Sequence, residues 1–465
     1  MDNNPLSKKQ LKRLVQAAGE SNVLHELADC WAYGQDNSRM HSPPLAVVFG
    51  TDHEQVVDVI RACNELGLSI TTRGRGTGTV GGAVPAANSV VLSLERMVEI
   101  LEIDTANRML DTQAGVLNQA IQDAVSGMGF FWAPDPTSAA FCTVGGNIAV
   151  NSAGPRSLKY GSTRENVLHL KAITGDGRTI QTGEYTTKGV VGYDLTRLII
   201  GSEGTLAVVT EATLKLTPLP EAIQTMQFIY NGVDHAAEAV VSIMGSSVTP
   251  RSLEIMDKAA LDLIRNEPGL DLPESANAIL IAEVDGDAAS LDELAAKMTA
   301  AARNAGLLDT RHARSEEEKS AVWSARKKLS PALRRIAPNK LNEDVVVPVA
   351  NLARLISGLG ELSAKFNIPI VNFGHAGNGN IHVNLLYDTQ NPEQAVAAKP
   401  CLDAVFELVL HLKGSISGEH GVGIAKRDYV DQEIDSTTLA LMRSIKDQFD
   451  PNNILNPGKV LPPPR

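Results

Sequence analysis

The sequence predicts an α+β protein with more than one domain, and three observations lead to this class. Residues 45–110 read as alternating strands and helices. Apolar side chains recur at every second position of 206–216, as in an antiparallel strand. A later region mixes a helical stretch within 288–305 with a strand at 278–284. The 465 residues are enough for two or three domains with their own cores.

Composition excludes several classes of protein. The 42 basic and 54 acidic residues give a net charge of −12, which argues against non-specific nucleic-acid binding. No apolar run approaches the length of a membrane span, and the N-terminus lacks the apolar segment of a signal peptide. The cysteines (Cys30, Cys63, Cys142, Cys401) form no CxxC pair, which favours free thiols in a reducing compartment. We therefore expect a cytoplasmic protein, with peripheral association at the inner face of a membrane still open.

The first motif is a glycine-rich loop that follows a strand–helix–strand pattern. A strand at 45–49 precedes a helix that Thr51 or Asp52 caps and Gly67 ends, and a second strand covers 68–72. The next ten residues, 73–82, contain five glycines. Such a loop lets backbone N–H groups converge on phosphate oxygens.

Three interpretations of this loop are open. Gly76, Gly78 and Gly81 satisfy GxGxxG, but a Rossmann turn requires a helix that starts inside the motif, and residues 83–89 cannot form one. The loop could also serve only to turn the chain. We favour a diphosphate cradle of another fold.

A second glycine cluster supports the cradle. The rigid turn at 132–137 leads into 143–154, where small and apolar residues suit a flat aromatic cofactor. A strand at 167–173 and a hairpin turn at 175–177 follow. The strand at 206–216 then places one set of side chains on a common side, before Pro218 and Pro220 end the domain: Leu206, Val208, Thr210, Ala212, Leu214 and Leu216.

Two polar patches near the C-terminus predict a catalytic site. His375 and His382 lie in 374–384, and Glu419 and His420 lie in 417–423, all in glycine-rich, uncharged surroundings. The odd spacing of the first two histidines puts them on opposite faces of a straight strand. They would converge only if His375 lies in a loop that bends over a strand containing His382. These residues alone would also suit a hydrolytic metal site or a set of satisfied loop groups.

Ordered sequence blocks resemble a known flavoprotein superfamily. RGRGTG (73–78), TVGGNIAVNSAG (143–154), KYG (159–161) and GYDLTRLIIGSEGTLAVVTEATLKL (192–216) are similar to the FAD-binding domain of the vanillyl-alcohol-oxidase or p-cresol-methylhydroxylase (PCMH) type. GHAGNGNIHVN (374–384), SGEHGVG (417–423) and DPNNILNPGK (450–459) resemble its D-2-hydroxyacid dehydrogenases. That branch includes glycolate oxidase flavin subunits, D-lactate dehydrogenases and D-2-hydroxyglutarate dehydrogenases.

The resemblance implies a domain order and an FAD site. It implies a two-subdomain PCMH-type FAD-binding domain in 1–220, an α+β cap domain with an antiparallel sheet in 221–425, and a helical segment in 426–465 that returns to the FAD domain. The first loop lacks the His that tethers flavin in some members, so FAD is expected to be non-covalent. The residues implied for FAD are Arg73, Gly74, Arg75, Gly76, Thr77, Gly78, Pro134, Thr143, Gly146, Asn147 and Glu203.

The resemblance also assigns roles in the second half of the chain. His375, His382 and Glu419 would bind a divalent Zn, Mn or Fe ion that lowers the pKa of the substrate hydroxyl. His420 would take the hydroxyl proton while hydride passes to flavin N5. Arg326, unless it is an exposed helical arginine, would bind the substrate carboxylate, and Asn384 would hydrogen-bond the substrate. Relatives usually carry Asp at the position of Asn378, a change expected to alter metal affinity.

The expected substrate is a small D-2-hydroxyacid, with D-lactate or glycolate favoured. D-2-Hydroxyglutarate dehydrogenases carry a substrate-binding Lys where this chain has Asn342, although D-2-hydroxyglutarate stays open as a substrate. The chain could also be an FAD-binding subunit that acts only within a multi-subunit glycolate oxidase, or a silent FAD-binding scaffold. The expected electron acceptor is a quinone, a cytochrome, an iron–sulfur subunit or an electron-transferring flavoprotein, and a homodimer is expected.

Overall fold

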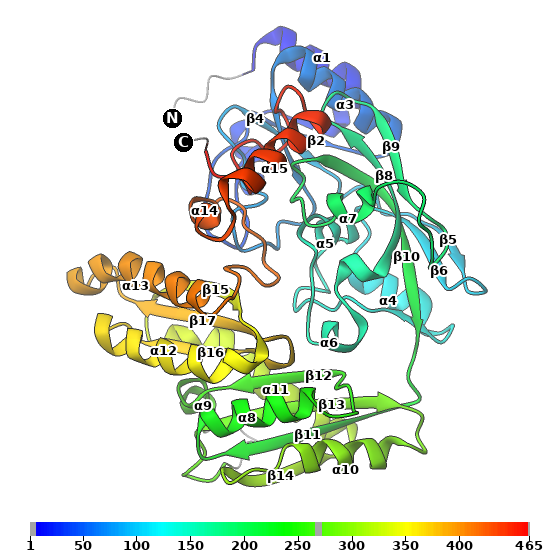
Figure 1. The fold of residues 1–465 in the computed structure, drawn as a ribbon. Helices are drawn as coiled ribbons and strands as arrows, with labels where there is room; N and C mark the ends of the chain where they lie inside the picture. The colour runs from blue at the N-terminus through cyan, green and yellow to red at the C-terminus, as the bar shows by residue number, and fades with distance from the viewer. Residues whose placement is uncertain (1–5, 266–271, 464–465) are drawn as a thin grey trace. The chain divides into compact units, whose positions relative to one another are not determined.

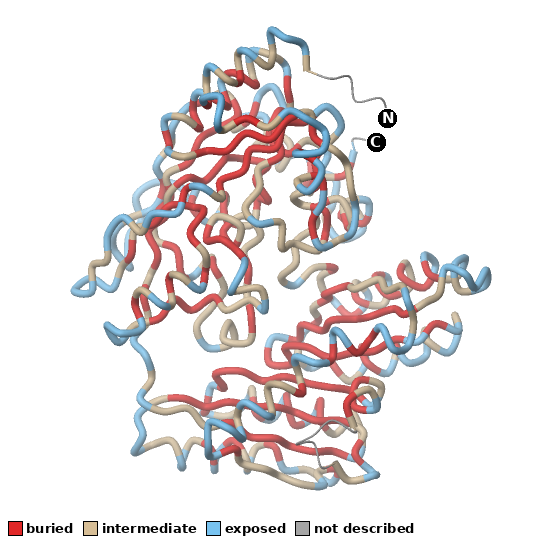
Figure 2. Tube along the Cα trace, turned by 180° about the vertical axis from the view of Figure 1, so that it is seen from behind, coloured by how far each residue is buried: buried red, intermediate tan, exposed pale blue. Residues whose placement is uncertain are grey.

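The computed structural model describes residues 6–265 and 272–463, which fold into two compact units (Figure 1). The first unit comprises Met1–Gly154, Gly161–Leu219 and Glu419–Arg465, and the second comprises Pro155–Tyr160 and Pro220–Gly418. Both units combine helices with sheets, and antiparallel strand pairs predominate. The predicted α+β class is therefore confirmed. Figure 2 shows that the strands are largely buried, while exposed residues gather on loops and outer helical turns.

The first unit begins with a small, largely parallel sheet. Its elements are α1 (Lys8–Ala18), β1 (Val23–Leu24), α2 (Leu27–Cys30), β2 (Ala46–Phe49), α3 (His53–Leu66), β3 (Ser69–Arg73) and β4 (Ser89–Ser93). The strand order is β1-β2-β4-β3, and only the pairing of β1 with β2 is antiparallel within it. As predicted, Asp52 caps α3 and Gly67, with a φ of 64°, ends it. Residues 74–88 contain no helix, so the Rossmann interpretation fails.

An antiparallel sheet forms a second part of the first unit. Its strands and helices are β5 (Ile100–Asp104), β6 (Met109–Gln113), α4 (Asn118–Ser126), β7 (Phe130–Trp132), α5 (Val144–Val150), β8 (Val167–Thr174), β9 (Thr179–Gly183), α7 (Leu195–Ile199) and β10 (Ala207–Pro218). The order is β5-β6-β10-β8-β9, with β7 also paired to β10. The predicted hairpin between β8 and β9 is confirmed.

The antiparallel strand predicted at 206–216 is confirmed by β10, but the prediction that its alternate residues share one side is wrong. The pairing of β10 with β8 shifts between Val209 and Glu211, which is a β-bulge. Before the bulge, Val208 packs into the core of the parallel sheet, whereas after it Ala212 and Leu214 pack into the core of the antiparallel sheet. The extra residue changes which side of the strand each alternate position occupies, and the sequence alternation alone does not reveal this.

The C-terminal segment belongs to the first unit. After α14 (Val430–Glu433) and α15 (Ser436–Phe449), the chain runs beside β3. The Ile70 N–H donates to Ile454 O at 2.6 Å, and the Asn456 N–H donates to Ile70 O at 2.8 Å. The Asp450 carboxylate accepts from the N–H groups of Ile454 and Leu455. The DPNNILNPGK block therefore acts as an added edge of the small sheet. All four cysteines are buried free thiols, as expected.

The second unit is built on an antiparallel sheet of order β14-β11-β13-β12-β16-β17-β15. Its strands are β11 (Ala222–Tyr230), β12 (Ser252–Met256), β13 (Ala278–Gly286), β14 (Leu307–Ala313), β15 (Asn339–Val346), β16 (Ile370–His375) and β17 (Asn380–Tyr387). Its helices are α6 (Ser157–Tyr160), α8 (Val233–Met244), α9 (Lys258–Ile264), α10 (Leu291–Ala301), α11 (Glu316–Ala332), α12 (Leu352–Phe366) and α13 (Pro392–His411).

The helices α9 and α11 cover one face of this sheet. Apolar side chains from both helices pack with residues of β13, β16 and β17, among them Ile281, Phe373 and Leu386. Strand alternation and register put Glu254 of β12, His375 of β16 and His382 of β17 on the same face as these apolar residues. We call this side of the sheet the α11 face.

Candidate active site

His375 and His382 lie on neighbouring strands of the α11 face. In the β16–β17 register, His375 is opposite Asn380 and Phe373 is opposite His382, so the two histidines are diagonal neighbours. Their ring centroids are 5.2 Å apart. The expectation that His375 lies in a loop is wrong, because the odd spacing crosses a hairpin instead of running along one strand.

A tight turn makes this register possible. Residues Ala376–Asn378 form a 3₁₀ turn, and Gly379 follows with a φ of 71°. A Cβ at Gly379 would collide with the carbonyl oxygen of Val347, so both the backbone conformation and the space require glycine. Asn378 is exposed in the turn. A carboxylate does contact His375, and it belongs to Glu254 of β12.

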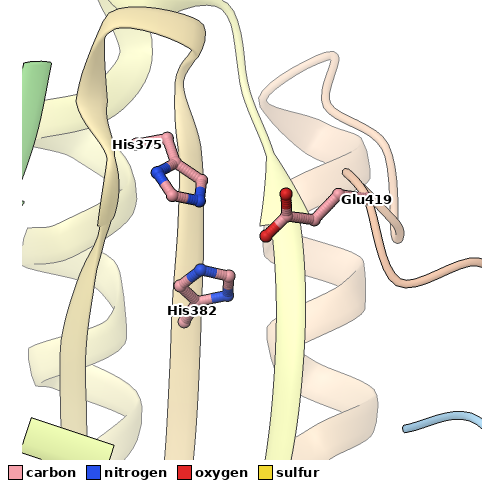
Figure 3. Close-up of side chains that lie close together, drawn as sticks. All are labelled: His375, His382 and Glu419. Atoms are coloured by element: carbon pink, nitrogen blue, oxygen red, sulfur yellow. The ribbon is translucent and has the colours of Figure 1, made fainter. Parts of the chain in front are cut away.

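Glu419 follows a residue that is fixed to β15. The Gly418 N–H donates to Asp344 Oδ2 at 2.9 Å and to Asp344 O at 3.1 Å. Asp344 is fully buried and lies opposite His382 in the β15–β17 register. One ligand atom each from His375, His382 and Glu419 lies within 4.8 Å of the others, and Figure 3 shows the three side chains pointing toward one another.

This donor set fits a divalent transition metal. Two imidazole nitrogens and one carboxylate oxygen are ligands that zinc, manganese and iron accept. Three protein ligands leave coordination positions for a substrate. Both histidines are more than nine-tenths buried, so the surrounding side chains restrict the movement of their rings. The residues present therefore fit the metal that the resemblance implies.

Glu254, which no sequence motif indicated, contacts two of the predicted site residues. Its Oε1 pairs with His375 Nδ1, and its Oε2 accepts from Arg326 Nε at 3.0 Å. The carboxylate is 1% exposed. Burial raises the pKa of Glu254, but the neighbouring His375 and Arg326 lower it by more, to about 2. The signal available in the sequence was a single acidic residue inside the apolar strand Ser-Leu-Glu-Ile-Met.

Arg326 lies on α11 and points to the same group of residues. Its guanidinium carbon is 4.5 Å from the ring centroid of Phe373, the residue opposite His382. Its side chain is 14% exposed, so the interpretation as an exposed helical arginine fails. The neighbouring basic residues are exposed, as expected of a solvated face: Lys327, Lys328, Arg334 and Arg335.

Asn384 is fully buried and mainly supports the hairpin. Its Nδ2 donates to Val371 O and to His382 O, both at 3.1 Å. Its Oδ1 accepts from Asn342 Nδ2 at 2.6 Å. Both N–H groups of the amide are thus used by the protein, which leaves only the carbonyl oxygen with capacity for a substrate.

Glu203 holds the loop that follows His420 in the first unit. Its carboxylate accepts from the N–H groups of Val422 at 2.6 Å and Gly423 at 2.8 Å. Burial raises the pKa of the Glu203 carboxyl, and these two hydrogen bonds oppose the rise. His420 Nε2 is 4.0 Å from Glu419 Oε1. Glu203, implied as a cofactor residue, thus contacts the backbone of the predicted catalytic loop.

Hydrogen bonds from Arg73 and Asn37 hold the first glycine loop, residues 73–82, in place. Arg73 Nη1 donates to Gln35 O at 2.6 Å, and a Cβ at Gly76 would meet the Arg73 guanidinium. Asn37 donates from its backbone to Gly78 O at 2.9 Å and from its side chain to Thr77 O at 3.2 Å. Arg75 is exposed, with Nε 3.8 Å from Glu95 Oε2.

The two glycine blocks meet at Thr143. Thr143 caps α5 by accepting from the Gly146 N–H at 3.2 Å, and a Cβ at Gly74 would collide with its hydroxyl. Pro134 is buried beside this region, and its carbonyl accepts from Asn118 Nδ2 at 3.0 Å. The structure thus places Gly74 of the first block against Thr143 of the second, two of the residues that were expected to bind FAD.

Buried donors in this part of the first unit fit FAD. Thr79 Oγ1, Asn147 Nδ2 and Ser202 Oγ are buried and have no hydrogen-bond partner among the described residues. Such groups are costly unless a ligand supplies acceptors, and the phosphate and ring carbonyl oxygens of FAD are acceptors. These groups, together with glycines where a Cβ would collide, fit a diphosphate and a flat ring.

The fold, the FAD cradle and the group of imidazole, carboxylate and guanidinium side chains define a flavin-dependent oxidoreductase. Residues 44–183 match the FAD binding domain family, and residues 219–460 match the family of FAD linked oxidases, C-terminal domain. The second match covers more than half of the chain, so the protein belongs to the FAD-linked oxidase family.

Named relatives and a solved structure agree with this family. The chain is 36% identical to a glycolate oxidase subunit of Bacillus subtilis over 98% of its own length and 97% of the relative's. It is 33% identical to a D-lactate dehydrogenase of Anaerostipes hadrus, over 90% of this chain and 89% of that one.

The structure of p-cresol methylhydroxylase with bound substrate matches with a TM-score of 0.80 and 19% identity, over 97% of this chain and 96% of that one. The PCMH-type fold is therefore confirmed. Among the described residues, no helix combines the length and apolar character that a membrane crossing requires.

Proposed function

We propose that this protein oxidises a small D-2-hydroxyacid, with D-lactate or glycolate favoured, to the corresponding 2-oxoacid. Residues of the first unit would bind FAD non-covalently, His375, His382 and Glu419 would bind a divalent metal, and Arg326 would bind the substrate. The observation that carries the proposal is the convergence of His375, His382 and Glu419, with Arg326 linked to His375 through Glu254. The names of the relatives, a glycolate oxidase subunit and a D-lactate dehydrogenase, support this substrate class.

Each residue has a distinct task in this reaction. When bound, FAD would accept a hydride from the 2-carbon while the metal draws charge from the 2-hydroxyl. Arg326 would bind the substrate carboxylate through its guanidinium fork. His420 would take the hydroxyl proton on a ring nitrogen, because imidazole accepts protons near neutral pH. Asp344 and Asn384 would hold the backbone that carries Glu419 and His382.

Asn342 favours a monocarboxylate over D-2-hydroxyglutarate. Its amide donates to Asn384 and brings no positive charge to the α11 face. A second carboxylate on the substrate would therefore lack the cation that the resemblance places at this position. Lys340, two residues away on the same side of β15, is the nearest basic residue along the strand.

Reduced FAD would pass its electrons to an acceptor other than NAD, such as a quinone, a cytochrome, an iron–sulfur subunit or an electron-transferring flavoprotein. A second candidate function is a subunit that acts only in a multi-subunit glycolate oxidase, which the name of the Bacillus subtilis relative favours. The isolated chain with an artificial acceptor separates the two, since turnover by the chain alone contradicts the obligate-subunit version. A homodimer remains our expectation.

Anaerobic bleaching of the flavin tests the main proposal. The FAD-loaded protein is mixed with D-lactate, glycolate, L-lactate and D-2-hydroxyglutarate, before and after treatment with a chelator. We expect bleaching by D-lactate or glycolate, loss of bleaching after chelation, and recovery when Mn²⁺ or Zn²⁺ is added back. Bleaching by L-acids alone would refute the stereochemistry, bleaching that resists chelation would refute the metal role, and no bleaching by any acid would favour the silent scaffold.

A further inference from the structure

We infer that Glu254 is the positioning residue that joins metal binding to substrate-carboxylate binding, an inference that rests on the proposed function. Glu254 is neither one of the proposed metal ligands nor one of the residues proposed to bind the substrate. It acts through His375 and Arg326, which its two oxygens contact separately. One buried carboxylate would thus set the orientation of both groups.

The contact with His375 fixes the ring nitrogens. A carboxylate accepts hydrogen bonds only, so the nitrogen facing Glu254 Oε1, Nδ1, carries the proton. The lone pair then lies on Nε2, the nitrogen that can coordinate a metal beside His382 and Glu419. A carboxylate behind a ligand histidine also makes the ligand nitrogen more basic.

The contact with Arg326 fixes the guanidinium. Glu254 accepts from Nε, and the Phe373 ring supports the guanidinium carbon at 4.5 Å. With Nε used, the Nη groups are the donors that a substrate carboxylate would meet. Arg326 stands on α11 and His375 ends β16, and Phe373 of β16 supports the guanidinium without contacting the His375 imidazole through a hydrogen bond. Glu254, on β12, is the group that contacts both.

Because Glu254 is buried, a change of its carboxylate to another polar group should disturb its contacts with His375 and Arg326. Glu254 is 1% exposed, so water cannot replace either partner. In Glu254→Gln one of the two oxygens becomes an NH₂ donor, which would face either the Nδ1 proton of His375 or the Nε proton of Arg326. The variant keeps the size of the side chain but cannot accept from both residues.

Metal titration of the FAD-loaded, chelator-treated protein tests the inference. Mn²⁺ or Zn²⁺ is titrated by calorimetry into the wild type, Glu254→Gln and Arg326→Lys. We expect Glu254→Gln to weaken metal binding by roughly 10- to 100-fold and to raise the KM for D-lactate at saturating metal. Arg326→Lys should raise the KM but leave metal binding within about twofold of the wild type, since it leaves the His375–Glu254 pair intact.

Two further variants separate positioning from stability. Glu343→Gln is the matched control, because Glu343 is also a buried carboxylate. It belongs to β15 and points to the other face of the sheet, away from His382. It should bind metal as the wild type does. Glu254→Asp keeps the charge but is one carbon too short to reach both partners, and should weaken both functions even if Glu254→Gln fails to fold.

The results distinguish this inference from the proposed function. If the wild type binds metal and D-lactate bleaches its flavin, but folded Glu254→Gln and Glu254→Asp bind metal equally tightly, the role of Glu254 is refuted and the function stands. If Glu254→Gln weakens metal binding but leaves the KM unchanged, the link to Arg326 is refuted. A wild type that binds no metal refutes the role of Glu254 and the proposed metal role, while bleaching of its flavin by D-lactate would still support the oxidation.

Discussion

The two units present their functional groups in different ways. In the first unit, the residues assigned to FAD are glycines, backbone groups and small polar side chains of two loops that meet at Thr143. The groups assigned to the metal and the substrate are instead imidazole, guanidinium and carboxylate side chains, of which His375, His382 and Arg326 of the second unit lie at a single face of a sheet. The first arrangement depends on the space left by missing Cβ atoms, and the second depends on strand register.

This difference predicts that the two functions can be lost separately. Added volume should damage the FAD cradle while leaving the metal ligands in place. Removal of one ligand side chain should abolish metal binding while the glycine loops remain unchanged. If added volume in the glycine loops also abolished metal binding, and removal of a metal ligand also abolished FAD binding, the two sites would not be independent.

The largest effect is expected for His382→Ala. Loss of one of three ligands should abolish metal binding and lower turnover of D-lactate by roughly 10³-fold, since metal assistance is worth several kcal/mol. The flavin spectrum and FAD content should match the wild type. Metal content and steady-state rates measure the effect, with His411→Ala, an exposed histidine at the end of α13, as the control. Equal turnover in His382→Ala would exclude this metal site.

A smaller effect is expected for Gly74→Ala. The new Cβ would collide with the Thr143 hydroxyl, and overpacking of this kind costs about 1–3 kcal/mol. FAD binding should therefore weaken by roughly 10- to 100-fold, as measured by FAD retained after desalting and by titration of the apoprotein. Metal affinity should not change. Gly127→Ala is the control, because a Cβ there meets no atom within 4 Å. Full FAD retention by Gly74→Ala would show that the loop can shift.

The smallest effect concerns Lys459, a buried lysine of the first unit. Burial lowers its pKa from 10.5 to about 7, against the opposing charges of Glu203 and Asp36. Between these two pKa values the unfolded chain binds more protons than the folded one, so Lys459 makes the free energy of unfolding rise with pH above about 7. The contribution is at most about 1.4 kcal/mol per pH unit.

Lys459→Met should flatten this rise. Urea unfolding of wild type and variant at pH 7 to 8.5 measures the difference in slope, to which the cysteines do not contribute because both proteins contain the same four. Lys12→Met, at an exposed position of α1, should keep the wild-type slope. An unchanged slope in Lys459→Met would mean that the buried amine stays charged or that its charge is offset in the folded state.

Local signals in the sequence predicted much of the fold. The caps of α3, the hairpin between β8 and β9, and the absence of a helix after the first glycine loop all follow from residues within a few positions. The predictions from the sequence were wrong where the same local pattern is compatible with two different structures. The alternation in 206–216 conceals a bulge at Thr210, and the odd spacing of His375 and His382 crosses a turn instead of following a strand.

The sequence by itself determined the class of protein, through ordered glycine blocks and the residue types of the two polar patches. Only the tertiary structure decided which side chains meet. Glu254 lies 121 residues before His375 and 72 before Arg326, and it reaches both because β12 and β16 are neighbours and α11 packs over their face. Contacts of this kind depend on strand order, register and helix packing, which no short stretch of sequence specifies.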